Sequence, residues 1–279
     1  MGVLEVLIKI TQNDIVDFET AQNALLKELK MFLAWYKKKV LELKNSKAQN
    51  KDFDEIILLK DFITDLWNEI LSKELQSSYT CSVLEKMLNR FVIQTQETLY
   101  LIGHDKGLSA ISNVRLFIEA LAITNYVMTN GEKEAERFVD YSYYQETLVE
   151  KKELDPKFIE KYGDKIKNSF YSIPYGWCSE EKMTGEKLVK KLNSNALVDY
   201  YRLTCNYIHA SPYSLIHISD AKNPFFPIPA ETLIRIIKIA LFQFITYVLD
   251  FTLSDEQKHP YLVLLKMIVP DLLKIDGEE

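Results

Sequence analysis

The stretch Ile234–Phe251 reads IRIIKIALFQFITYVLDF and is the most apolar segment of the chain. The segment carries Arg235, Lys238, Gln243 and Asp250. A membrane span needs about 20 predominantly apolar residues with few charges. We therefore expect residues 230–251 to form a core helix in a protein without a membrane partner, and a single span is the lesser alternative.

The rest of the sequence shows the same helical periodicity. Apolar residues recur every three or four positions, while glycine and proline number only 8 each in 279 residues. The sequence has no alternating strand pattern bounded by hairpin turns. We therefore predict an all-α, multi-helix bundle of about eight to ten helices. Helices are expected at residues 13–43, 54–75, 82–102, 109–128, 132–150, 186–192, 230–251 and 260–275, with a shorter one opened by Asp155 and Pro156.

The sequence contains no composition break that forces a domain boundary. Residues 1–78 are expected to form an N-terminal helical hairpin, either appended to the main domain or part of it. Residues 79–279 are expected to form the helical core domain. Pro270 is expected to kink or shorten the last helix, since proline lacks the amide hydrogen that continues the helical ladder.

Charge and cysteine content narrow the functional classes. The formal net charge is −6 and the isoelectric point is near 5.5, so a whole-chain basic surface for nucleic acid is absent. The basic clusters at residues 37–39 and 187–191 lie next to acidic residues and are interpreted as solvated helix faces. Three widely spaced cysteines without a CxxC pair indicate a reduced, cytoplasmic protein. We expect no cofactor and no metal site.

Residues 200–212, YYRLTCNYIHASP, carry the strongest functional signal. On a helix, seven residues turn through about 700°, close to two full turns. Arg202 and His209 are therefore expected on one side of a helix, with Asn206 between them. Histidine can exchange a proton at neutral pH, and arginine can hold a phosphate in a bidentate fork. The alternative is a buried polar network in which Arg202 pairs with a carboxylate.

The Arg-x6-His spacing on an all-helical chain resembles the HEPN superfamily, in which an arginine is followed by four to six residues and a histidine. This resemblance implies a HEPN-like core and metal-independent RNA cleavage by a homodimer that brings two Arg/His pairs into one cleft. It also implies a toxin or an antiviral-defence effector. Catalytic members often carry a polar residue directly after the arginine, where this chain has Leu203, and Asn206 is the candidate substitute.

A second resemblance covers residues from about 80 to 250. Its motifs are the Arg115-x3-Glu119 helix, Trp177, and a segment from Tyr201 to Ser211. These motifs are similar to those of a bacterial all-helical family of unknown function. That family offers no activity that can be carried over to this chain.

Arg115 and Glu119 lie four residues apart on one expected helix, among apolar neighbours. Because buried charges need partners, we expect them to pair with each other and with Arg202, His209 or a nearby tyrosine such as Tyr201. Together they would support the catalytic residues Arg202, His209 and Asn206. An intrahelical ion pair that ties two helices together is the structural alternative.

Three functional classes remain open on sequence alone. The leading hypothesis is the ribonuclease, with RNA as substrate and a second copy of the chain as partner. The second is a non-catalytic helical subunit that binds a partner protein, one encoded in the same operon being a candidate. The third is a small-molecule or nucleotide sensor with the Arg/His/Glu cluster in a pocket between helices.

Overall fold

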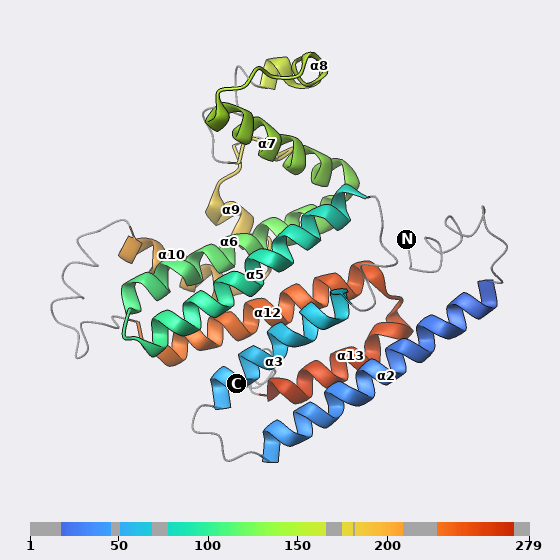
Figure 1. Cartoon of the computed structure of the whole chain (residues 1–279). Helices are drawn as coiled ribbons and strands as arrows, with labels where there is room; N and C mark the ends of the chain where they lie inside the picture. Colours follow the sequence, from blue (N-terminus) through green and yellow to red (C-terminus); the bar gives the residue numbers. More distant parts are fainter. Residues whose placement is uncertain are drawn as a thin grey trace. The chain divides into compact units, whose positions relative to one another are not determined.

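The computed structural model describes residues 18–45, 51–68, 78–165, 175–180, 182–208 and 228–270. Every regular element within these ranges is a helix (Figure 1), which confirms the predicted all-α multi-helix bundle. The ten helices described are α2 (Phe18–Asn45), α3 (Lys51–Leu66), α5 (Tyr79–Gly103), α6 (Gly107–Asn130), α7 (Glu132–Glu150), α8 (Pro156–Lys165), α9 (Gly185–Lys190), α10 (Asn195–Ile208), α12 (Ala230–Thr252) and α13 (Asp255–Ile268).

Most predicted helix boundaries agree with these ranges, and local signals explain where helices stop. α6 ends before Gly131, whose φ of 77° suits glycine because it has no Cβ to clash in that left-handed region. α8 begins at Pro156, and the Asp155 carboxylate accepts a hydrogen bond from the Lys157 amide at 2.7 Å. The predicted residues 13–17 and 69–75 lie outside the described residues.

The last helix is where the predicted boundaries are wrong. α13 covers Asp255–Ile268 rather than residues 260–275, and it passes through Pro260. Its start is fixed by a capping box, in which Ser254 and Gln257 each hydrogen-bond the other's backbone amide. It ends two residues before Pro270, which agrees with the expected shortening and not with a kink, and the predicted residues 271–275 lie outside the described residues.

The chain divides into two compact units. The first contains residues 1–76, 88–117 and 204–279, and the second contains residues 77–87 and 118–203. The expected division at residue 78 stays a prediction, as does a HEPN-like core.

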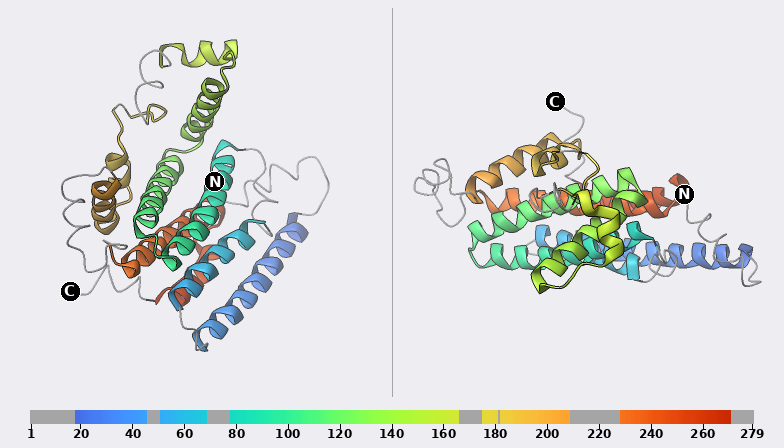
Figure 2. Two further views of the ribbon diagram at one scale, coloured as in Figure 1. Left: turned by 60° about the vertical axis from the view of Figure 1, so that its left-hand side comes forward. Right: turned by 90° about the horizontal axis from the view of Figure 1, so that it is seen from above.

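In the first unit, α12 packs along α3, and α13 packs along α2 and α3 (Figures 1 and 2). Phe91 lies between two further rings, 4.9 Å from Phe117 and 4.4 Å from Phe244, measured between ring centroids. α12 also buries Lys238, whose Nζ donates to Glu55 Oε2 at 2.5 Å and to Asp52 Oδ1. As predicted, the most apolar segment of the sequence is therefore a core helix, and its one buried cation is paired.

Two helices, α6 and α12, are long and apolar enough to cross a membrane by length and composition alone. Their apolar windows are already 56% and 61% buried by other parts of the protein. The core helices of soluble proteins pass the same test, so this finding is weak evidence for a span.

In the second unit, the core forms around Trp177. Its ring packs edge-on against Tyr126 and Phe138, with centroid distances of 5.7 and 4.9 Å. Leu188 and Val189 of α9 and Leu197 of α10 are also buried in this unit. This core holds the short helix α9 and the first part of α10, which carry the candidate site.

Candidate functional site

The short helix α9 depends on its surroundings for its position, because six residues are too few for a stable isolated helix. Thr184 caps its start by accepting a hydrogen bond from the Lys187 amide at 3.3 Å. Asn193 then turns the chain with a φ of 53°, a left-handed conformation that asparagine tolerates. Ser194 follows and caps α10 through the Leu197 amide at 3.4 Å.

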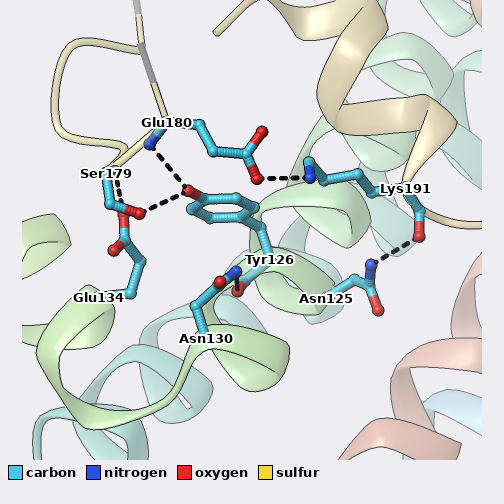
Figure 3. A network of polar contacts seen from close by, with 7 residues as sticks. All are labelled: Asn125, Tyr126, Asn130, Glu134, Ser179, Glu180 and Lys191. Atoms are coloured by element: carbon cyan, nitrogen blue, oxygen red, sulfur yellow. Dashed lines mark hydrogen bonds and ion pairs between the residues drawn. The ribbon is translucent and has the colours of Figure 1, made fainter.

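A polar network fixes the segments that flank α9 (Figure 3). The Tyr126 hydroxyl lies 3.1 Å from Ser179 Oγ and accepts a hydrogen bond from the Glu180 amide at 3.4 Å. Lys191 donates to the Glu180 carboxylate at 2.6 Å, and its carbonyl accepts from Asn125 at 3.0 Å. Burial raises the pKa of Tyr126, so the hydroxyl stays protonated and can hold these contacts. α9 is thus anchored to α6 on both sides.

A second contact, made by Tyr201, anchors α10. Tyr201 is buried, and its hydroxyl donates to Glu119 Oε1 at 3.1 Å. The same oxygen passes so close to Gly185 that a Cβ there would lie 2.3 Å from it. The Tyr175 oxygen would lie 3.0 Å from that Cβ. Position 185 therefore requires glycine. Because α9 begins with this glycine, the helix can approach the Tyr201–Glu119 pair closely.

Arg202, the next residue of α10, lies at the surface and joins a charge cluster. Its Nε and Nη2 donate to Glu186 Oε1 at 3.1 and 2.7 Å. Lys190 Nζ lies 3.0 Å from the same oxygen, and Asp199 Oδ1 lies 3.6 Å from Arg202 Nη1. Hydrogen bonds from Arg202 and Lys190 hold the pKa of the Glu186 carboxyl below its usual value, and Glu186 raises the pKa of Arg202. Both shifts favour the charged forms of Glu186 and Arg202.

This cluster borders a cavity of about 580 Å³ at the junction of α9 and α10. The lining is predominantly polar and consists of Lys190, Asn193, Ser194, Asn195, Val198, Asp199 and Arg202. Two cations, two amides and a hydroxyl supply hydrogen-bond donors to this cavity, while Asp199 is its one carboxylate. The cavity suits a small anionic group better than an apolar ligand.

The structure brings some of the predicted site residues together and leaves others apart. The structure brings Tyr201 and Glu119 together and pairs Arg202 with Glu186 and Asp199. Arg115 is half-buried on α6, and Asn206 is exposed on α10; both belong to the first unit. His209 lies outside the described residues.

Glu186, Lys190 and Asp199 are charged residues of this cluster that the sequence interpretation missed, as it did the polar turn at Asn193, Ser194 and Asn195. Lys190 was part of the basic cluster at residues 187–191, interpreted there as a solvated helix face. A short-range rule would have paired Glu186 with Lys190, four positions apart on one helix. No sequence rule pairs Glu186 with Arg202, because the turn at Asn193 decides how α9 and α10 meet.

No group of three or more histidine, cysteine, aspartate or glutamate side chains in the described ranges could hold a metal ion. His104 is exposed and stacks on Tyr100, with ring centroids 4.0 Å apart. Its Nδ1 lies 2.8 Å from the Tyr100 carbonyl oxygen, so the imidazole contacts the last turn of α5 and does not belong to the charge cluster.

The fold and the site define an all-helical protein with a surface charge cluster at the junction of two helices. The family of unknown function DUF5677 matches residues 82–225, slightly more than half of the chain, and the protein belongs to this family. The predicted membership in an uncharacterised helical family is thereby confirmed. No curated protein and no solved structure matches the chain.

Proposed function

We propose that the protein is a HEPN-like, metal-independent endoribonuclease in which Arg202 binds the reacting phosphate and His209 acts as the general acid and base. The observation that supports this most is the position of Arg202. Its side chain is 49% exposed and borders a polar cavity, where a substrate can reach it. An arginine that only satisfied a buried carboxylate would be enclosed.

The proposed reaction uses the nucleophile that RNA itself carries. The 2′-oxygen attacks the adjacent phosphorus and passes its proton to a base, while the 5′-oxygen of the next nucleotide leaves and takes up a proton. His209 supplies and accepts these protons. The guanidinium of Arg202 stabilises the negative charge that develops on the phosphate oxygens. The products are a 2′,3′-cyclic phosphate and a 5′-hydroxyl.

The other predicted residues support this chemistry indirectly. The hydrogen bond from Tyr201 to Glu119 fixes α10 and therefore the helix position from which Arg202 extends. Asn206 is exposed one turn further along α10 and is proposed to orient the phosphate or the imidazole. Arg115 is proposed to support the site from α6. We extend the proposal to a cytoplasmic homodimer that acts as a toxin or antiviral-defence effector.

The test is cleavage of 5′-labelled RNAs of varied sequence by the purified protein in EDTA. His209→Ala should slow cleavage by about 10²–10⁴-fold, the usual contribution of a general acid or base. Arg202→Ala should slow it by a similar factor, about 10²–10³-fold, as for other charge-stabilising donors. The matched controls are His104→Ala and Arg90→Ala, which remove exposed side chains of the same types. Equal rates in His209→Ala and wild type, or no cleavage of any RNA by wild type, would overturn the proposal.

A second candidate function, a non-catalytic interaction subunit, is favoured by an apolar groove in the first unit. The groove, about 380 Å³ in volume, is lined by residues of α2 and α13, including Leu33, Val263 and Met267. Met31 and Trp35 of the same helix α2 are also exposed. Exposed apolar patches of this kind often mark protein-binding surfaces. Under this alternative, Val263→Asp abolishes the biological effect of the protein in cells, whereas His209→Ala and Arg202→Ala leave it intact.

A further inference from the structure

One carboxylate oxygen in the charge cluster accepts contacts from two cations. Glu186 Oε1 lies 3.1 Å from Arg202 Nε, 2.7 Å from Arg202 Nη2 and 3.0 Å from Lys190 Nζ. The cations come from different helices, Lys190 from α9 and Arg202 from α10. Two cations that converge on one oxygen form the arrangement in which proteins hold a phosphate oxygen.

The cluster lies on the surface, so another charged group can replace one partner of its ion pairs. The Lys190, Arg202 and Glu186 side chains are 53%, 49% and 43% exposed. Ion pairs between exposed side chains contribute little to stability because water and salt screen them. Glu186 can therefore leave Arg202 without the desolvation penalty that holds a buried pair together.

The cavity next to the cluster supplies room and donors for a larger anion. The side chains of Asn193, Ser194 and Asn195 border it on the turn between the helices. A phosphate group has more acceptor oxygens than a carboxylate, so it can bind both cations and these polar side chains at once. Asp199 is 75% exposed and lies at the longer distance of 3.6 Å from Arg202. The surrounding water therefore makes its repulsion of an anion weaker than that of a buried carboxylate.

We propose that a phosphate group of RNA binds Arg202 and Lys190 at the edge of this cavity and that Glu186 occupies this position on the two cations in the free protein. The phosphate replaces Glu186 on Arg202 and Lys190, which makes Lys190 a substrate-binding residue and Glu186 a built-in competitor. The assignment of RNA as the source of the phosphate rests on the proposed function. The geometry of the two cations does not depend on it.

The test measures binding of a fluorescein-labelled 2′-O-methyl RNA oligonucleotide, which lacks the free 2′-hydroxyl and cannot be cleaved by the proposed reaction. Glu186→Gln should tighten binding about tenfold, because the competing charge is gone while the side-chain shape is kept. Glu160→Gln is the matched control, since it removes one exposed carboxylate from α8 in the same unit. Equal effects of these two substitutions would overturn the proposal, because general charge would then explain both.

Lys190 provides an independent measurement. Removing one phosphate-binding cation from a complex with single-stranded RNA lowers the slope of log K against log salt by about 0.7. Lys190→Gln should reduce the slope by this amount. Lys187→Gln, on the same helix, should leave the slope unchanged, because the Lys187 Nζ contacts the Lys182 carbonyl at 3.0 Å. Equal slopes for Lys190→Gln and wild type would overturn the assignment of Lys190.

Competition with ATP and with inorganic phosphate identifies the source of the phosphate. The proposal expects neither to displace the oligonucleotide at concentrations where unlabelled RNA does. Displacement by ATP as effective as by RNA would overturn RNA as the ligand. The two proposals can fail separately: RNA cleavage without an effect of Glu186→Gln contradicts only the binding site. The expected binding changes without cleavage contradict only the ribonuclease.

Discussion

Two of the cation–carboxylate clusters among the described residues have opposite composition. In the first unit, the single cation Lys238 contacts two carboxylates, Glu55 and Asp52. In the second unit, one oxygen of Glu186 contacts two cations, Arg202 and Lys190, and Asp199 lies beside Arg202. The side chains of Lys238 and Glu55 are 9% and 5% exposed and Asp52 is half-exposed, whereas the Lys190, Arg202 and Glu186 side chains are 53%, 49% and 43% exposed.

This difference in burial separates a structural cluster from an exchangeable one. Charges removed from water interact strongly but cannot lose a partner without leaving an uncompensated charge behind. Charges that remain in water can change partners at little cost. Lys238 therefore stabilises the α3–α12 packing, and Arg202 is proposed to bind a ligand.

Removal of the buried carboxylate should have the largest effect. Glu55→Gln leaves Lys238 with a neutral partner on its buried side. We expect a loss of about 3 kcal/mol in the free energy of unfolding, at the lower end for a broken buried pair. Urea denaturation followed by circular dichroism measures this loss. A change no larger than that of Glu186→Gln would remove the distinction between the two clusters.

Gly185→Ala should cost about 1–3 kcal/mol, the range for an overpacked site. The added Cβ would lie 2.3 Å from the Tyr201 oxygen and break its hydrogen bond to Glu119. Because Tyr201→Phe removes the clashing oxygen, we expect Gly185→Ala to cost less in that background. The same denaturation experiment on the double-mutant cycle measures the coupling, and additive costs would contradict the close approach.

Replacement of both buried charges should restore stability. In Glu55→Met with Lys238→Met, two apolar side chains fill the space, while the half-exposed Asp52 returns to water. We expect the double variant to lie within about 1 kcal/mol of wild type, as found when buried pairs are replaced by apolar residues of similar volume. A double variant less stable than Glu55→Gln would indicate that the ion pair itself stabilises the unit.

The substitution Glu186→Gln should have the smallest effect on stability. Because the pKa of Glu186 is lower in the folded protein, its stabilising contribution is present above its unfolded pKa of 4.5. The contribution is lost as the pH falls through the lower folded value. The stability difference between wild type and Glu186→Gln should therefore be small at pH 7 and vanish on acidification. A difference that grows on acidification would show that the carboxyl is not held in its charged form.

Sequence patterns predicted the helices well because helical periodicity and end signals are local. The stop at Gly131 and the start at Pro156 are both set by neighbouring residues. The start of α13 was missed, although its signal, Ser254 three residues before Gln257, was equally local. The partners of the charged residues were harder to predict. Lys238 and Glu55 are 183 positions apart, and no local rule connects them.

Only part of the candidate site could be predicted from the sequence. Tyr201 and Glu119 were predicted as supporting residues, and their hydrogen bond brings together α6 and α10 across 82 positions. The role of Glu186 depends on the turn at Asn193 and on the anchoring of α9 by Tyr126 and Lys191. These are properties of packing that composition and spacing do not encode.

Arg202 and His209 are proposed to cleave RNA through its own 2′-hydroxyl. A decisive experiment compares cleavage in EDTA of an RNA oligonucleotide that wild-type protein cuts with one carrying a single 2′-deoxy substitution at the cut site. We expect a 2′,3′-cyclic phosphate product from the first, no cleavage at the substituted site of the second, and little product from either with His209→Ala. Equal cleavage of both oligonucleotides, or equal cleavage by His209→Ala and wild type, would contradict the proposal.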